Sequence, residues 1–164
     1  MRALAVVACL ALLAGCTGTS ASPAAAIPTE APAAATPSPD LIGPAGEAYL
    51  AAAKAYNTAT GKLKAPSTKA KLKTVKAYWA KTTKLQKAFT DAMLGLQVPP
   101  ETQPTLDEMI AASTALTERY RAMSKARNWI QMIDLNAGLV AVQERAAAAA
   151  TLLRHKLGLP DRPG

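Results

Sequence analysis

The chain has little of the chemistry that most catalytic and metal sites need. Its 164 residues include one histidine, His155, and two cysteines, so no second histidine can join the first as a metal ligand. No carboxylate forms the Glu-x-x-His pattern of di-iron helical bundles. A glycine-rich phosphate loop and a Gly-x-Ser-x-Gly nucleophile turn are also missing. We therefore expect a protein that is not an enzyme and that binds neither a metal nor a cofactor.

A long apolar run is missing as well, and the one uncharged apolar stretch lies at the start of the chain. Arg2 precedes an uncharged run over residues 3–14, which is the pattern of a secretory signal. A helix needs about 20 apolar residues to cross a bilayer, so this run is too short to do so. Residues 1–15 are predicted to be an export signal.

The end of this signal carries the most specific motif of the chain, Leu13-Ala14-Gly15-Cys16. It resembles the lipobox of bacterial lipoproteins. The resemblance implies that residues 1–15 are removed and that Cys16 receives a diacylglyceryl group, which anchors the protein on the extracytoplasmic face of the plasma membrane. The alternative is an ordinary secretory signal that leaves Cys16 as a free thiol. With Cys9 cut away in either case, no cysteine pair remains to form a disulfide.

Prolines crowd the segment after Cys16. The residues between them are mostly alanine, threonine and serine, with few large apolar side chains. Prolines at this density break helices and sheets, and small polar residues bury too little area to offset the entropy of ordering. The sequence predicts a disordered linker over residues 16–44, with a reach of about 90 Å when extended.

Helical periodicity dominates residues 45–159, and no segment has the two-residue period of a strand. Short connections make neighbouring helices antiparallel. We therefore expect an all-α fold, an antiparallel up-down-up-down four-helix bundle, followed by a frayed tail over residues 160–164. Helix starts are predicted after Pro44, at Pro66-Ser67 and at a capping box, Thr105-Leu106-Asp107-Glu108.

The second helix has the clearest inward face. Its predicted inward residues are Leu72, Val75, Tyr78, Trp79, Thr82, Leu85, Gln86, Phe89, Met93 and Leu96. The last helix is expected to end with Gly158 in the left-handed position that follows many helices. Apolar residues crowd together over residues 128–136, where the period is ambiguous, and Asp134 is a possible cap for the last helix.

Positive charge is concentrated in one stretch. Ten lysines lie within residues 54–87, and no acidic residue occurs between Glu47 and Asp91. Such a block can attract an anionic lipid surface or a wall polymer that bears phosphates. The alternative is a solvated face that keeps the bundle soluble. Nucleic acid is not expected, because export removes the protein from it. The predicted basic face consists of Lys69, Lys73, Lys76, Lys84 and Lys87.

Two further features have a functional and a structural interpretation. Tyr56, Trp79 and Tyr120 could line a pocket for a small ligand between helices, or they could pack the core. His155 could be a general base, or it could simply complement the dipole at the end of the last helix.

The whole arrangement resembles small helical-bundle lipoproteins of the actinobacterial type, which as a class are mostly without an assigned activity. The resemblance implies a role for Cys16 alone. We expect a non-enzymatic, lipid-anchored cell-envelope protein that presents a lysine-rich bundle to envelope components. The alternative is a small-ligand-binding or sensor module. No feature of the sequence fixes a ligand, a partner or an oligomeric state.

Overall fold

The computed structural model describes residues 39–160, and the regular structure in this range is entirely α-helical. The predicted all-α class is therefore confirmed for these residues. The predicted signal peptide, Cys16, residues 17–38 of the predicted linker and residues 161–164 lie outside the described range. The helices are α1 (Pro39–Gly61), α2 (Leu72–Leu94), α3 (Gln103–Ser124), α4 (Trp129–Ala137) and α5 (Leu139–Lys156).

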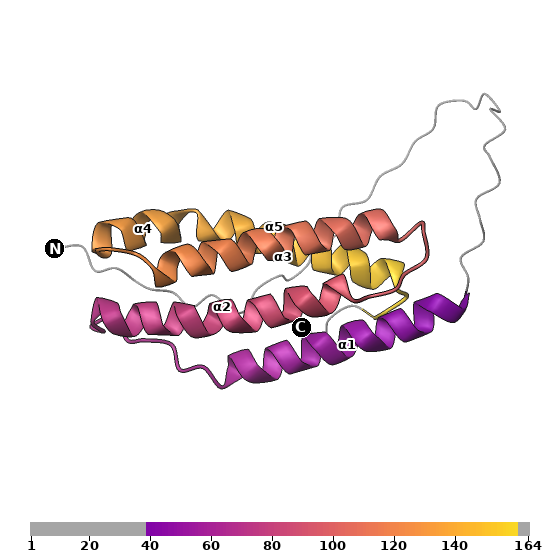
Figure 1. Ribbon diagram of the computed structural model, residues 1–164, viewed down its shortest axis with the longest axis horizontal. Helices are drawn as coiled ribbons and strands as arrows, with labels where there is room; N and C mark the ends of the chain where they lie inside the picture. The colour runs from indigo at the N-terminus through magenta and orange to yellow at the C-terminus, as the bar shows by residue number, and fades with distance from the viewer. Residues whose placement is uncertain (1–38, 161–164) are drawn as a thin grey trace, which may run out of the picture.

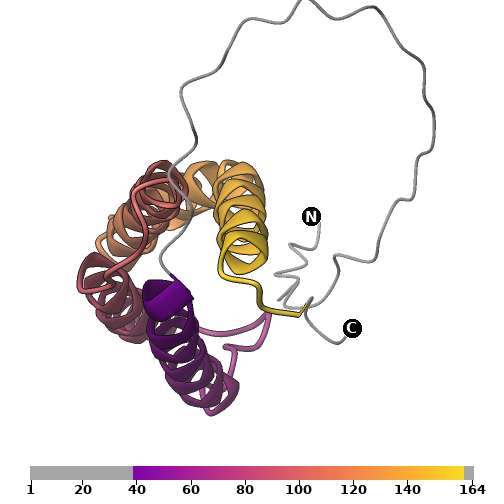
Figure 2. The same cartoon turned by 90° about the vertical axis from the view of Figure 1, so that its right-hand side faces the viewer.

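The four longer helices lie side by side along one axis (Figure 1). α1 packs on α2, α2 packs most extensively on α3, and α3 packs on α5. In Figure 1, α1 and α3 run toward the end of the bundle that holds α4, whereas α2 and α5 run away from it. The end view in Figure 2 shows the four helices arranged around a common centre. No described helix is long and apolar enough to cross a bilayer.

The predicted inward face of α2 is turned toward the core. Val75, Thr82, Gln86 and Met93 are buried on α2, and Leu96 is buried just after it. The remaining predicted inward residues are half-buried, namely Leu72, Tyr78, Trp79, Leu85 and Phe89. The three-and-four-residue spacing of apolar side chains was therefore a correct guide to this face.

Buried hydroxyls line part of the contact between α2 and α3. Thr90 donates a hydrogen bond to the carbonyl oxygen of Gln86 at 2.9 Å, and Thr117 donates one to that of Ser113 at 2.8 Å. The two threonine Oγ1 atoms lie 3.5 Å from each other across the interface. Bonds within each helix therefore satisfy the two threonine hydroxyls, whereas the Ser113 Oγ is buried without a hydrogen-bond partner among the described residues. Small side chains also let the helices approach closely, with Ala112 and Ser113 fully buried.

The first helix begins earlier than the sequence indicated. α1 starts at Pro39 and contains Pro44, so residues 39–44 of the predicted linker are helical. A proline inside a helix removes one hydrogen bond and normally clashes with the Cβ of the preceding residue. The preceding residue here is Gly43, which has no Cβ, and Pro44 is near the helix start. The cost is therefore small enough for the helix to continue through it.

Two further predicted helix starts are wrong in detail. α2 begins at Leu72 and not at Pro66-Ser67. Thr102 occupies the N-cap position of α3, so Thr105 lies inside the helix and is buried, and no capping box forms. The backbone N–H of Thr102 instead donates to the carbonyl oxygen of Pro99 at 2.8 Å, and this turn sets the helix start.

The ambiguous segment around residue 130 is a separate short helix, α4, and not the beginning of the last helix. Asn128 caps it, because its Oδ1 accepts the backbone N–H of Gln131 at 2.9 Å. The suggested cap residue Asp134 lies within α4. Gly138 separates α4 from α5.

The predicted end of the last helix is confirmed. Gly158 has a φ of 64°, and its N–H donates to the carbonyl oxygen of His155 at 3.1 Å. The N–H of Leu159 donates to the carbonyl oxygen of Arg154 at 3.0 Å, which completes the Schellman motif. Leu159 then packs against α1, because a Cβ placed on Gly46 would lie 3.2 Å from Leu159 Cδ2.

Candidate functional site

The lysines of residues 54–87 extend from α1 through the α1–α2 connection and along α2. All are exposed except Lys76, which is half-buried. Of the five predicted face residues, Lys73, Lys84 and Lys87 lie on the side of α2 away from its buried residues, and the half-buried Lys76 lies at the edge of that side. Lys69 lies in the α1–α2 connection, before α2 begins. Only Lys87 forms an ion pair with a described residue, with its Nζ 2.7 Å from Asp91 Oδ2. The other positive charges therefore have no carboxylate partner among residues 39–160.

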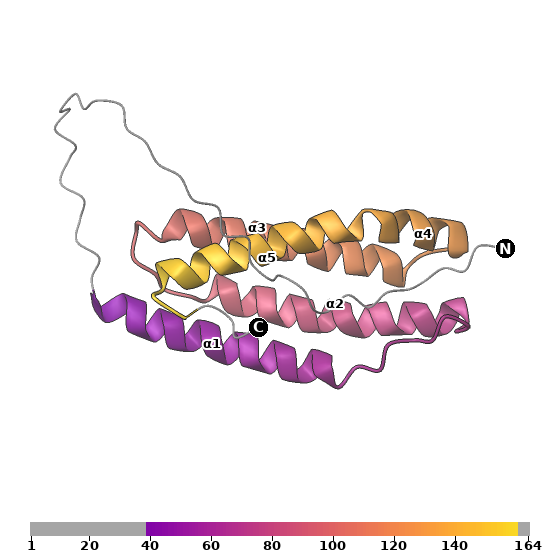
Figure 3. The ribbon, with the colours of Figure 1, turned by 180° about the vertical axis from the view of Figure 1, so that it is seen from behind.

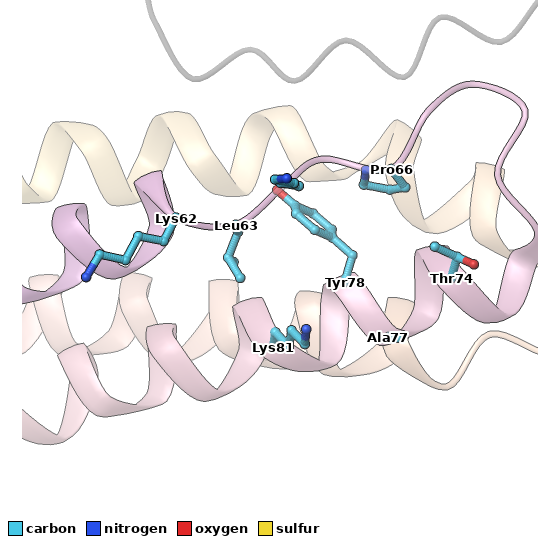
Figure 4. Close-up of a pocket in the computed structure, with 8 residues that line it drawn as sticks. Lys62, Leu63, Pro66, Thr74, Ala77, Tyr78 and Lys81 are labelled. Atoms are coloured by element: carbon cyan, nitrogen blue, oxygen red, sulfur yellow. The ribbon is translucent and has the colours of Figure 1, made fainter.

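A hollow of about 380 Å³ opens between the α1–α2 connection and α2 (Figure 4). We call it the lysine hollow. Figure 4 shows the Tyr78 ring rising from α2 with its hydroxyl directed at the connection, Lys81 lying beside its base, and Lys62 extending outward. Its lining residues are Lys62, Leu63, Lys64, Pro66, Thr74, Ala77, Tyr78 and Lys81.

The charges around this hollow all have one sign. Three ammonium groups and the hydroxyls of Thr74 and Tyr78 can donate hydrogen bonds, and no carboxylate lines the wall. Ammonium groups form charge-assisted hydrogen bonds with phosphate and carboxylate oxygens, which are stronger than neutral ones. The arrangement is therefore suited to an anionic group near the surface.

The hollow and the predicted basic face are neighbours with different members. None of Lys69, Lys73, Lys76, Lys84 and Lys87 lines the hollow, although all five lie on α2 or just before it. Lys81, which does line it, was not part of the predicted face. Its contribution depends on how the α1–α2 connection folds back beside α2, and no local pattern in the sequence specifies that path.

The three aromatic residues suggested for a ligand pocket are divided between two clusters. The rings of Trp79 and Tyr120 stack on each other, with centroids 5.2 Å apart and planes at 22°. Tyr56 instead lies beside Phe89, with centroids 5.5 Å apart. None of the three lines the lysine hollow. Because the rings of Trp79 and Tyr120 stack face to face, they do not enclose a pocket between them.

Tyr120 is tied to the core by its hydroxyl as well as by its ring. Gln143 Nε2 donates a hydrogen bond to the Tyr120 hydroxyl at 3.2 Å, which links α3 to α5. Burial raises the pKa of Tyr120 above its usual value, because the phenolate would be desolvated. The hydroxyl therefore stays protonated at neutral pH and serves a structural hydrogen bond.

A surface ion pair supports the same helix contact. Arg145 Nε and Nη2 donate to the two carboxylate oxygens of Glu108 at 2.8 and 3.1 Å. The bond to Arg145 lowers the pKa of Glu108, and the same bond raises the pKa of Arg145. Glu108, expected to close a capping box, thus joins α3 to α5 instead.

The remaining candidates do not form a cluster. His155 is exposed in the last turn of α5, between Arg154 and Lys156. Within residues 39–160, no three histidine, cysteine or acidic side chains lie close enough to share a metal ion. Cys16 belongs to the part of the chain outside this range.

No protein-family model matches the chain, and no curated protein or solved structure matches it either.

Proposed function

We propose that this chain is a non-enzymatic, lipid-anchored protein of the cell envelope. In this proposal the chain is exported and cut before Cys16, and the lipid on that cysteine holds it at the extracytoplasmic face of the plasma membrane. The linker then presents an up-down-up-down helical bundle. The bundle contacts anionic groups through its lysines, whether those groups belong to acidic lipids or to a phosphate-bearing wall polymer.

One observation carries the interaction part of this proposal, namely the uncompensated lysine block. Nine of its ten lysines have no carboxylate partner among the described residues, and three of them border a single hollow. Each lysine near an anionic surface contributes about 1 kcal/mol, and the contribution fades within a Debye length of about 8–10 Å. The attraction therefore becomes useful only for a protein that is held beside an anionic surface, which is what the lipid on Cys16 would provide.

The interaction is tested by binding of the detergent-solubilised chain to inorganic polyphosphate. We expect binding that weakens steeply as salt is added, because the contacts are charge pairs screened by ions. The triple variant Lys62→Gln, Lys64→Gln, Lys81→Gln should bind roughly a hundredfold more weakly, because about 1 kcal/mol is lost for each of the three contacts.

The matched control removes the same charge from other places, with Lys54→Gln, Lys84→Gln and Lys156→Gln. These lysines are exposed and do not line the hollow. We expect a smaller loss of affinity in this variant, and equal losses would show that the hollow is not a site. Repeating the titration with acidic-lipid vesicles separates a polymer from a lipid as the source of the anion. If the affinity for both probes does not change with salt concentration, the proposed interaction is wrong.

A further inference from the structure

The helix α4 exposes large apolar side chains to water. Trp129 is 42% exposed, Ile130 is 72% exposed and Ile133 is 39% exposed. On the other side of the same helix, Met132 is buried and Leu135 is half-buried against the core. α4 is thus apolar on two sides, and only one of them packs on the bundle.

The three exposed side chains form one continuous surface, which we call the α4 patch. Residues 129 and 133 are four positions apart and residues 130 and 133 are three apart, so their side chains are neighbours on the helix. Val140, which is also exposed, lies just beyond in the first turn of α5. A contiguous exposed apolar surface of this kind marks a contact with a protein or a membrane.

Positive charges lie at the same end of the bundle as the α4 patch. The α3–α4 connection carries exposed Lys125 and Arg127, while Asp134 is the single acidic residue of α4. The α1–α2 connection and the start of α2 reach the same end of the bundle (Figures 1 and 3). They bring Lys69, Lys71 and Lys73 to that end. An apolar patch at a positively charged end of the bundle complements the hydrocarbon and the anionic headgroups of a lipid surface.

The size of the α4 patch argues against a second copy of the chain as its partner. A stable protein interface buries about 800 Å² on each side. Even a fully covered aromatic side chain supplies only about 150–250 Å², so a tryptophan with two isoleucines falls well short. Insertion into lipid has no such threshold, because each buried apolar group contributes on its own. Tryptophan is also the residue enriched at the boundary between headgroups and hydrocarbon.

The anchored chain is long enough for this end of the bundle to reach the membrane. α1 begins at the end of the bundle opposite α4 (Figure 1), so the segment that follows Cys16 joins the described helices far from the patch. The roughly 22 residues between Cys16 and Pro39 span up to about 70 Å when extended, at ~3.1 Å each. A helix as long as α2 spans about 35 Å. The linker can therefore pass along the bundle with length to spare.

We propose that the α4 end docks on the acidic lipid surface, with Trp129, Ile130 and Ile133 inserted among the acyl chains. The domain then rests on the membrane through two separate contacts, the lipid on Cys16 and the α4 patch. The inference rests on the proposed function only for the presence of a nearby membrane.

Tryptophan fluorescence tests this contact in the full lipidated chain, reconstituted into vesicles of acidic phospholipid that carry brominated acyl chains. Trp129 should be quenched by the bromine atoms, whereas Trp79, half-buried against Tyr120, should not. Trp129→Phe identifies the quenched component, which should disappear in that variant. We expect Ile130→Asp to abolish most of the quenching of Trp129.

The matched control is Leu94→Asp, which introduces the same charge at a leucine that is 62% exposed at the other end of the bundle. It should leave the quenching unchanged. Both substituted side chains are exposed, so we expect both variants to keep their helices, and circular dichroism checks this. Quenching that survives Ile130→Asp, or an unquenched Trp129 in a chain that floats with the vesicles, would overturn the inference.

Flotation of the vesicles distinguishes a failure of the α4 contact from a failure of the proposed lipid anchor. A chain that does not float has no functioning anchor, and the same variants are then compared after adding the chain to an excess of acidic vesicles. Loss of quenching in Ile130→Asp alone still supports the α4 contact. If the chain instead forms dimers in the absence of lipid, at higher concentration, and Ile130→Asp disrupts them, the α4 patch is a contact between two copies of the chain and not with lipid.

Discussion

Replacing Cys16 with alanine should move the protein from the membrane fraction to the soluble fraction of the producing cells. Two acyl chains give stable anchoring, and the described helices include none that could cross a bilayer in their place. The residual attraction of the lysines and the α4 patch should be removed by washing with salt. We therefore expect nearly all of the variant in the wash and nearly all of the original chain in the pellet, measured by quantitative fractionation.

The second cysteine supplies the matched control for this experiment. Cys9 lies in the predicted signal and is removed with it, so Cys9→Ala should leave the partitioning unchanged. If Cys16→Ala stays with the membrane after the salt wash, anchoring through Cys16 is wrong. If Cys9→Ala is released as well, the chain is not cut where we propose.

Replacing Leu153 with alanine should lower the free energy of unfolding by about 2–5 kcal/mol. The side chain is fully buried on α5, and a leucine-to-alanine change in a core loses both transfer energy and packing. Alanines make up much of the surrounding core, including Ala146 and Ala149 on the same helix, so few large side chains can shift to fill the cavity. Domains are stable by only about 5–15 kcal/mol, and this loss is therefore large.

The adjacent leucine provides the comparison. Leu152 is 50% exposed, so Leu152→Ala should cost less than about 1 kcal/mol. Urea unfolding followed by circular dichroism measures both variants under the same conditions. Equal losses for the two positions would contradict the packing of α5 against the rest of the bundle.

Helix type and inward faces could be predicted from the sequence, because apolar spacing reports directly on which side of a helix is buried. The break between α4 and α5 could not be predicted from the sequence. A Cβ on Gly138 would lie 1.7 Å from Arg119 Nη2, so a guanidinium from α3 occupies the space beside this glycine. That contact joins residues far apart in the chain, and no local pattern contains it.

The candidate surfaces also differ in how far the sequence predicts them. The lysine block is visible in the sequence because it depends only on composition. The lysine hollow depends on the path of the α1–α2 connection, where Leu63 and Pro66 are half-buried beside α2. The α4 patch was hidden for a related reason. The apolar residues around position 130 have an ambiguous period, so the sequence does not show which of them face outward. The structure shows that Met132 packs inward and that Ile130 and Ile133 face out.

The proposed anchoring depends most on the identity of the first residue of the mature chain, and mass spectrometry of the N-terminal tryptic peptide tests this directly. No lysine or arginine occurs between Cys16 and Lys54, so that peptide spans residues 16–54. We predict a mass equal to these residues plus at least a diacylglyceryl group, with residues 1–15 missing. A mature peptide that starts at any other residue, or one that carries an unmodified Cys16, would contradict the account.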